Sequence, residues 1–184
     1  MTLQLLTNLA HPYDEVAARY DELWSTPEAR AEDREIMRTI NYRDGLVLDI
    51  GCGTGLFLDH HRNCSNYIGV DPSQGMIDQL SKKHGSRTTL CQTFEDAMPS
   101  LASLRFNRII SLFGSPSYVK PSALIQAKEW LKPGGWMFCM FIAPDYNPET
   151  HAYIAEPPPM FDHVPAEYGA WSRFGNYIVT RYQA

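Results

Sequence analysis

Leu46-Val47-Leu48-Asp49-Ile50-Gly51-Cys52-Gly53-Thr54-Gly55 is the stretch that decides the fold of this 184-residue chain. Its first half is a short apolar run, which is typical of a strand covered on both faces. Its second half alternates glycines, which let a strand turn abruptly into a helix and bring backbone N–H groups against a ligand. A strand, a glycine loop and an acidic residue in this order predict a nucleoside-binding loop.

Two features of the loop argue against a dinucleotide as its ligand. A dinucleotide fingerprint would place a third glycine at position 56, which is leucine here. Asp49 lies two residues before the first glycine, where its carboxylate would repel a pyrophosphate. It suits a ligand that carries positive charge and no phosphate, so an NAD-dependent oxidoreductase is disfavoured. A plain strand–turn–helix loop without a ligand is the other alternative.

Outward from this loop, strand and helix patterns alternate. Short apolar runs recur at 67–70, 88–91, 108–113 and 136–142, and helical patterns separate them at 56–62, 73–83, 95–103 and 121–131. Such alternation predicts parallel pairing with right-handed crossovers. Lys132-Pro133-Gly134-Gly135 is expected to end the last helix and start the fifth strand. The predicted fold is α/β, an open, mostly parallel Rossmann-like sheet with helices on both faces.

Both flanks of this core have their own patterns. Apolar spacing predicts an amphipathic helix over 14–24, and Thr26-Pro27 begins a second helix that runs to about Ile40. Residues 144–170 hold six prolines and predict irregular structure. Phe174-Gly175-Asn176-Tyr177 predicts a tight antiparallel hairpin of strands near 170–174 and 177–182. We expect one domain over 1–184: a helical cap (1–44), a core (45–143), and an irregular segment with a closing hairpin (144–184).

Composition restricts the partners and the compartment. The net charge is −5 and no Lys or Arg run stands out, which disfavours a nucleic-acid backbone as a partner. No apolar stretch reaches the ~18 residues of a membrane span, and no basic region typical of a signal peptide follows Met1. The four scattered cysteines predict reduced thiols in a cytoplasmic protein rather than a metal site or a disulfide.

Asp71 is the second candidate binding residue. It lies twenty residues after Gly51, at the end of the second predicted strand. In an open α/β sheet a carboxylate at this point can take two ribose hydroxyls in the crevice at the strands' carboxyl ends. Capping of the helix that follows is the alternative, and the position favours ribose binding.

At these motifs the sequence resembles a known family. Residues Leu46–Leu58, Val70–Met76 and Leu131–Gly135 resemble successive motifs of class I S-adenosylmethionine-dependent methyltransferases, in particular the small-molecule group. The stretch from Tyr13 to Asp21 resembles that group's N-terminal helix. The resemblance covers about 12–143. It implies a seven-stranded sheet and in-line transfer of a methyl group from S-adenosylmethionine to a small-molecule acceptor, with S-adenosylhomocysteine as product.

The resemblance also implies which residues would hold this cofactor. Its methionine portion would lie on the loop, near Asp49, Gly51, Cys52, Gly53 and Gly55. Its ribose and adenine would lie beside Asp71, Pro72 and Met76. The family's acidic adenine contact falls on Thr93 here, so Glu95 or the Phe94 backbone would replace it. The sulfonium would be flanked by Ser111, Leu112 and Phe113.

Aromatic side chains are the candidates for covering the crevice. Tyr13 and Tyr20 are seven residues apart, so they share a face of the predicted helix, and we expect them to contact the cofactor. A second candidate is the set Tyr146, Tyr153, Phe161, Tyr168 and Trp171. For most of these rings, packing against the sheet edges is the simpler interpretation.

No catalytic residue can be assigned from the sequence. Positioning of the two reactants alone can lower the reaction barrier by up to ~7–11 kcal/mol in well-oriented systems. The candidate bases are His11, His151 and His163, and the simpler interpretation of each is a solvent-exposed loop histidine. Three alternatives stay open: an enzyme for a very small acceptor, a site completed by a partner such as a second copy in a homodimer, and a non-catalytic S-adenosylmethionine-binding protein. Ser115-Pro116-Ser117-Tyr118 resembles the S-P-P-Y motif of adenine and glutamine amino-methyltransferases, which the acidic composition disfavours.

Overall fold

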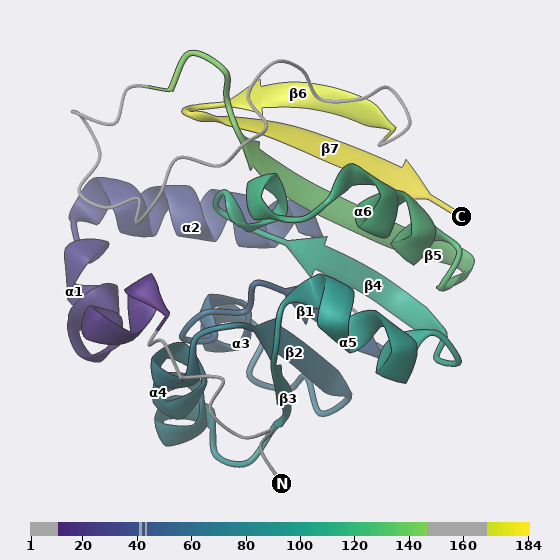
Figure 1. The fold of residues 1–184 in the computed structure, drawn as a ribbon. Coiled ribbons are helices and arrows are strands. Elements are labelled where there is room, and N and C mark those ends of the chain that lie inside the picture. The colour runs from purple at the N-terminus through teal and green to yellow at the C-terminus, as the bar shows by residue number, and fades with distance from the viewer. Residues whose placement is uncertain (1–10, 41, 43, 147–168) are drawn as a thin grey trace, which may run out of the picture.

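A computed structural model describes residues 11–40, 42, 44–146 and 169–184. Their strands form one seven-stranded sheet in the order β3-β2-β1-β4-β5-β7-β6 (Figure 1). The strands are β1 (Val47–Ile50), β2 (Tyr67–Asp71), β3 (Thr88–Cys91), β4 (Phe106–Ser111), β5 (Leu131–Ile142), β6 (Ala170–Phe174) and β7 (Tyr177–Gln183). The first five are parallel, and β7 runs antiparallel to both of its neighbours. The predicted open, mostly parallel sheet with a terminal hairpin is confirmed.

The centre of the sheet is β1. Leu48 pairs with Ile68 of β2 on one side and with Ile109 of β4 on the other. The chain builds outward from β1 to β3 and then returns to place β4 against the free edge of β1. At this reversal the loops that leave β1 and β4 turn to opposite sides of the sheet. The crevice that they leave at the strands' carboxyl ends is where ligands bind in open α/β sheets.

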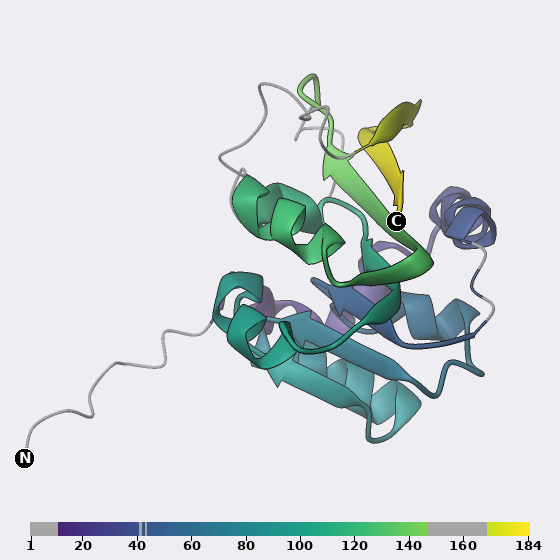
Figure 2. The same cartoon turned by 90° about the vertical axis from the view of Figure 1, so that its right-hand side faces the viewer.

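Helices cover both faces of the sheet (Figures 1 and 2). On one face lie α5 (Phe94–Leu101) and α6 (Pro121–Lys128), and on the other α2 (Pro27–Ile40), α3 (Leu56–His60) and α4 (Gln74–His84). Successive side chains of a strand point to opposite faces of the sheet, so the core is divided into two layers. Leu48 packs with α5 and α6, whereas its neighbour Val47 packs with α2, α3 and α4. Burying one such side chain contributes about 1.5–3 kcal/mol, so both helical layers are held by the same strands.

The predicted helix over 14–24 is wrong. The chain instead forms two 3₁₀ turns, η1 (Pro12–Glu15) and η2 (Ala17–Arg19), and a four-residue helix, α1 (Tyr20–Leu23). The Asp14 carboxylate accepts a hydrogen bond from the His11 N–H at 2.8 Å, which closes the first turn. It also bonds to residues at the start of α4. These tertiary bonds determine the backbone here, and the apolar spacing does not.

Two boundaries in the core also differ from the prediction. The stretch Lys132–Gly135 lies within β5, which begins at Leu131, and the register with β4 shifts between Phe106 and Arg108. Strand β4 ends at Ser111, so Leu112 and Phe113 belong to the following loop. The other core elements agree with the prediction to within a few residues.

The flanking predictions have different outcomes. The helix to Ile40 is confirmed with Ile36 and Met37 buried, and so is the hairpin β6–β7. Most of the proline-rich segment, residues 147–168, lies outside the described residues. The cysteines are free, and all except Cys91 are buried. Within the described part of the chain, no helix is both long enough and apolar enough to cross a membrane.

Candidate functional site

A cavity of about 460 Å³ lies at the carboxyl ends of β1, β2, β3 and β4. We call it the glycine-loop cavity. The loops that follow these four strands supply most of its wall. Residues 11–24, which we call the N-terminal segment, cover it. Its lining includes His11, Pro12, Tyr13, Tyr20, Gly51, Gly53, Asp71, Pro72, Met76, Thr93, Phe94, Glu95, Phe113, Ser115 and Tyr118. Ten of the fifteen predicted cofactor contacts are therefore brought together around one cavity.

Two positions of the loop require glycine for different structural reasons. A Cβ on Gly51 would lie 2.4 Å from the Cβ of Ser115, so only glycine permits this close approach between the loops after β1 and β4. Gly53 has φ +51°, and apart from its two chain neighbours no atom of the described residues lies within 4 Å of the position of its missing Cβ. The space above Gly53 is therefore open to a ligand.

Asp71 ties the glycine loop to the turn after β2. Its carboxylate accepts hydrogen bonds from the Gly53 N–H at 2.8 Å and from the Ser73 N–H at 2.9 Å. Burial raises the pKa of Asp71 above its usual value, although these two bonds oppose the effect. Ser73, not Asp71, caps α4, through the Met76 N–H at 3.1 Å. A carboxylate has about four lone-pair sites, so Asp71 can hold the loop and still accept hydrogen bonds from a ligand.

Asp49 lies beneath the loop and does not line the cavity. Its side chain is buried and accepts a hydrogen bond from the Tyr67 hydroxyl at 2.8 Å. Burial raises the pKa of Asp49 to about 7, against the effect of the Tyr67 bond. Four other predicted contacts also lie behind the cavity wall: Cys52, Gly55, Ser111 and Leu112. Ser111, for example, is buried and donates a hydrogen bond to the Ile50 carbonyl at 2.8 Å.

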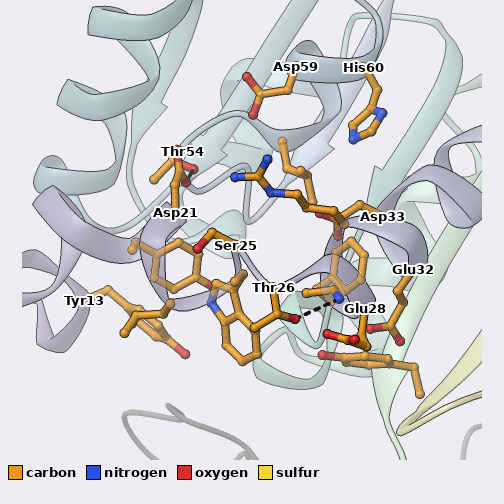
Figure 3. Close-up of a pocket in the computed structure, with 18 of the residues that line it drawn as sticks. Tyr13, Asp21, Ser25, Thr26, Glu28, Glu32, Asp33, Thr54, Asp59 and His60 are labelled. Atoms are coloured by element: carbon orange, nitrogen blue, oxygen red, sulfur yellow. Dashed lines mark hydrogen bonds between the residues drawn. The ribbon is translucent and has the colours of Figure 1, made fainter.

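A second cavity, of about 990 Å³, adjoins the first and reaches α2. We call it the α2 cavity (Figure 3). Four aromatic residues line both cavities: Tyr13, Tyr20, Phe113 and Tyr118. We call these four the shared wall. The rings of Tyr13 and Tyr20 meet edge to face at 6.0 Å between centroids. Their predicted proximity is therefore confirmed, although no continuous helix carries them.

Phe113 of the shared wall has a strained backbone. Its φ of +47° is positive, and no other described residue except glycine shares this property. Such a conformation costs on the order of 1–3 kcal/mol and persists where the surroundings impose it, often at functional sites. The Phe113 ring packs edge to face against Tyr177 of β7 at 5.6 Å. Phe113 lines both cavities, so this strained residue lies at their junction.

The N-terminal segment is held over the glycine-loop cavity by carboxylates. Asp14 accepts hydrogen bonds from the Ser73 hydroxyl at 2.6 Å and the Gly75 N–H at 2.9 Å. Burial alone would raise the pKa of Asp14, but these bonds outweigh it and the pKa is lowered. Asp21 pairs with Lys83 of α4 at 2.7 Å. Sequence reasoning missed the role of Asp14, although it lies in the stretch that resembles the family.

The remaining candidates divide between the two cavities. His11 lines the glycine-loop cavity, and His60, which sequence reasoning missed, lines the α2 cavity. Tyr146 also lines the α2 cavity, whereas Trp171 is exposed on β6. Glu95 lines the glycine-loop cavity and accepts a hydrogen bond from the Lys120 N–H at 2.7 Å. The other candidates lie outside the described residues: His151, His163, Tyr153, Phe161 and Tyr168.

Comparison with known proteins finds similarity to methyltransferases. Residues 47–135 match the family model described as "Methyltransferase domain". The chain is 31% identical over 137 residues to the uncharacterized protein MJ1252 of Methanocaldococcus jannaschii, covering 73% of this chain and 51% of that protein. It is 28% identical over 131 residues to dTDP-3-amino-3,4,6-trideoxy-alpha-D-glucopyranose N,N-dimethyltransferase of Streptomyces venezuelae, covering 67% of this chain and 53% of that one.

A solved structure agrees with the family model. The crystal structure of Streptomyces venezuelae DesVI aligns with a TM-score of 0.55 and 26% identity, over 74% of this chain and 60% of that one. The sheet has the Rossmann-like strand order, and over residues 47–135 the chain is similar to class I methyltransferase domains, the class whose cofactor is S-adenosylmethionine. The chain spans about half the length of the curated relatives it matches.

Proposed function

We propose that this protein is an S-adenosylmethionine-dependent methyltransferase that acts on a small-molecule acceptor. The observation that supports it best is the pair of adjoining cavities. The glycine-loop cavity has the position and lining expected for the methyl donor, and the α2 cavity offers space for an acceptor across the shared wall. A methyl group has to pass from one molecule to the other in line, and this arrangement provides such a path.

The proposed donor contacts follow the lining of the first cavity. Gly53 would leave room for the methionine portion, Asp71 would accept hydrogen bonds from the ribose, and Met76 with Phe94 would pack beside the adenine. S-adenosylmethionine supplies a methyl group on a positively charged sulfur, which is already a strong electrophile. The aromatic faces of the shared wall would attract that charge and exclude water from the path.

The acceptor class rests on the relatives and on the second cavity. The Streptomyces venezuelae relative is named for an amino sugar, and a Cereibacter sphaeroides relative, 29% identical over 133 residues (69% of this chain, 53% of that one), is named ubiquinone biosynthesis O-methyltransferase. Both names describe small molecules. We further propose that residues up to 44 act as a cap, 45–143 as the donor-binding core, and the rest as the wall that closes the acceptor side.

Calorimetric titration with S-adenosylmethionine, S-adenosylhomocysteine and NAD tests the donor assignment directly. We expect the first two to bind with one site and NAD to show no binding, because Leu56 stands where a dinucleotide loop needs glycine. Binding of NAD alone would overturn the proposal.

A second assay separates an enzyme from a binding protein. The protein is incubated with S-adenosylmethionine and a panel of amines, alcohols and carboxylic acids, and formation of S-adenosylhomocysteine is followed. Acceptor-dependent release supports the proposed transferase. Donor binding without release by any acceptor would favour the alternatives, a non-catalytic binding protein or a subunit that needs a partner.

A further inference from the structure

The α2 cavity carries an excess of negative charge. Five carboxylates line it against two guanidinium groups: Asp21, Glu28, Glu32, Asp33 and Asp59 against Arg30 and Arg62. Lys83 already neutralises part of this charge, because it bridges Asp21 and Asp59 at 2.7 and 2.8 Å. The other three carboxylates belong to one element, α2, and Figure 3 shows them along one side of the cavity.

Glu32 and Asp33 are the α2 carboxylates that are partly withdrawn from water. Both side chains are half-buried, whereas Glu28 is exposed. Burial raises the pKa of Asp33 to about 6, and the negative charge of Glu32 adds to the effect. Arg30 and Arg34 act in the opposite direction, and Asp59 adds to the increase. A cation placed beside the two carboxylates would be stabilised by both of them.

Aromatic rings line the α2 cavity together with these carboxylates. Tyr20 and Trp24 meet edge to face at 6.3 Å, and Tyr13 continues this aromatic lining toward the glycine-loop cavity. Figure 3 shows Tyr13 on the side opposite to Glu32 and Asp33. The faces of tyrosine and tryptophan rings attract cations within about 6 Å, most strongly where water is excluded. The rings and the carboxylates therefore favour the same charge on a ligand.

We infer that the α2 cavity receives an acceptor with a protonated amine, held by the Glu32 and Asp33 carboxylates together with aromatic rings of the lining such as Tyr20 and Trp24. This inference rests on the methyltransferase function proposed above and assigns its substrate class. An anionic acceptor would be repelled by the α2 carboxylates. A neutral hydroxyl compound could donate a hydrogen bond to them but would lack the ionic attraction, so charge favours the amine.

With an amine as acceptor, the atoms and electrons of the methyl transfer balance. The ammonium group first loses one proton to solvent, which leaves a lone pair on nitrogen. That lone pair forms the new bond to the methyl carbon, while the electrons of the carbon–sulfur bond stay on sulfur. The sulfonium thereby becomes the neutral thioether of S-adenosylhomocysteine. The shared wall lies between the two cavities, so it would surround the reacting atoms.

Three aromatic probes of similar size and different charge test the inference: benzylamine, benzyl alcohol and benzoate. Each is titrated into protein saturated with S-adenosylhomocysteine at pH 7 and also into protein alone, with ligand-observed NMR as the readout. We expect benzylamine to bind at least tenfold more tightly than benzyl alcohol, and benzoate to bind most weakly. Increasing the salt concentration should weaken benzylamine binding and leave benzyl alcohol unaffected.

A double variant, Glu32→Gln with Asp33→Asn, locates the binding. It should reduce the benzylamine affinity about tenfold, leave benzyl alcohol unchanged, and leave S-adenosylhomocysteine affinity within twofold. Glu35→Gln is the matched control, because Glu35 is exposed on the same helix and lines neither cavity. Equal affinities for the three probes, or a double variant that binds benzylamine like the parent, would overturn the inference. Failure of the proposed function shows separately, as absence of S-adenosylhomocysteine binding.

Discussion

At Gly53 a side chain is disfavoured by the backbone conformation, and not by clashes with neighbouring residues. Its φ is +51°, yet no atom of the described chain lies within 4 Å of the missing Cβ. An alanine there would cost roughly 1–2 kcal/mol because of its left-handed backbone. Its methyl group would also project into the space that we assign to the methionine portion of the donor.

Gly53→Ala should therefore reduce S-adenosylhomocysteine affinity at least tenfold, as measured by calorimetry. Gly85→Ala is the matched control. Gly85 follows α4 with φ +71°, has nothing within 4 Å of its missing Cβ, and lines neither cavity. Both variants should lose thermal stability, Gly85→Ala at least as much because φ +71° with ψ −166° is a region nearly confined to glycine, but only Gly53→Ala should lose affinity. Equal affinities in the two variants would contradict the loop assignment.

Asp71 holds the loop together and is also assigned to the ribose, so a simple alanine variant cannot separate the two roles. Titration with S-adenosylhomocysteine and its 2′-deoxy analogue can. We expect the parent to bind the analogue about tenfold more weakly, since a charge-assisted hydrogen bond contributes ~1.5–3 kcal/mol. In Asp71→Asn that preference should shrink to about threefold or less. A preference that the variant leaves intact would limit Asp71 to its bonds with Gly53 and Ser73.

Asp49 should make stability depend on pH. Its pKa is raised to about 7 in the folded protein, from an ordinary value near 3.9 in the unfolded chain. Between these values only the folded state holds the proton, so the contribution is complete below about pH 4 and is lost as pH rises through 7. Asp49→Asn should remove this slope and raise the free energy of unfolding at pH 8, on the order of 2–4 kcal/mol. Urea unfolding of both proteins at pH 5 and pH 8 measures the difference, and parallel profiles would contradict it.

At the scale of elements, the N-terminal segment is the part that covers the glycine-loop cavity. It reaches the core mainly through Asp14, which bonds to Ser73 and Gly75, and through Asp21, which pairs with Lys83. Turns held by few contacts open more readily than packed helices. Hydrogen exchange over residues 11–24 should therefore slow when S-adenosylmethionine binds, and it should be faster in Asp14→Ala without ligand.

Asp78→Ala provides the control for that experiment. Asp78 is also on the surface near the start of α4, where it accepts a hydrogen bond from Gln74, and no hydrogen bond or ion pair joins it to the described residues 11–24. It should leave exchange over residues 11–24 unchanged. If protection in the parent is the same with and without S-adenosylmethionine, the segment does not act as a lid.

The sequence predicted the strands better than it predicted this segment, for a physical reason. A buried parallel strand is a local apolar run, as in residues 46–50, and its position follows from the run itself. The turns over residues 12–23 follow from bonds between Asp14 and residues about sixty positions away. Periodicity carries no information on such partners. The strain at Phe113 has no sequence signal either, because it arises where the loop after β4 meets β7.

At the scale of the whole molecule, the two cavities also differ in whether local sequence motifs predict them. Most of the glycine-loop cavity follows short motifs that each lie at the end of a strand, so Gly53, Asp71 and Met76 could be named from the sequence. The α2 cavity combines α2, the segment before it, α3, the loop after β4 and β7. Its residues run from Tyr13 to Tyr177 and share no motif, so only the fold brings them together.

Because the site joins the N-terminal segment to the loops of four strands, ligand binding should stabilise the whole domain. A ligand that binds only the folded state at one hundred times its Kd adds about 2.7 kcal/mol. For a chain of this length each kcal/mol corresponds to roughly 2–4 °C in Tm, so S-adenosylhomocysteine should raise the Tm by about 5–10 °C. NAD at the same concentration should not change it. At that fixed concentration Asp14→Ala should show a smaller increase than the parent, because part of the cover is lost. If S-adenosylhomocysteine binds in calorimetry but the Tm does not move, the ligand binds the unfolded chain as well, and the folded cavity is not its site.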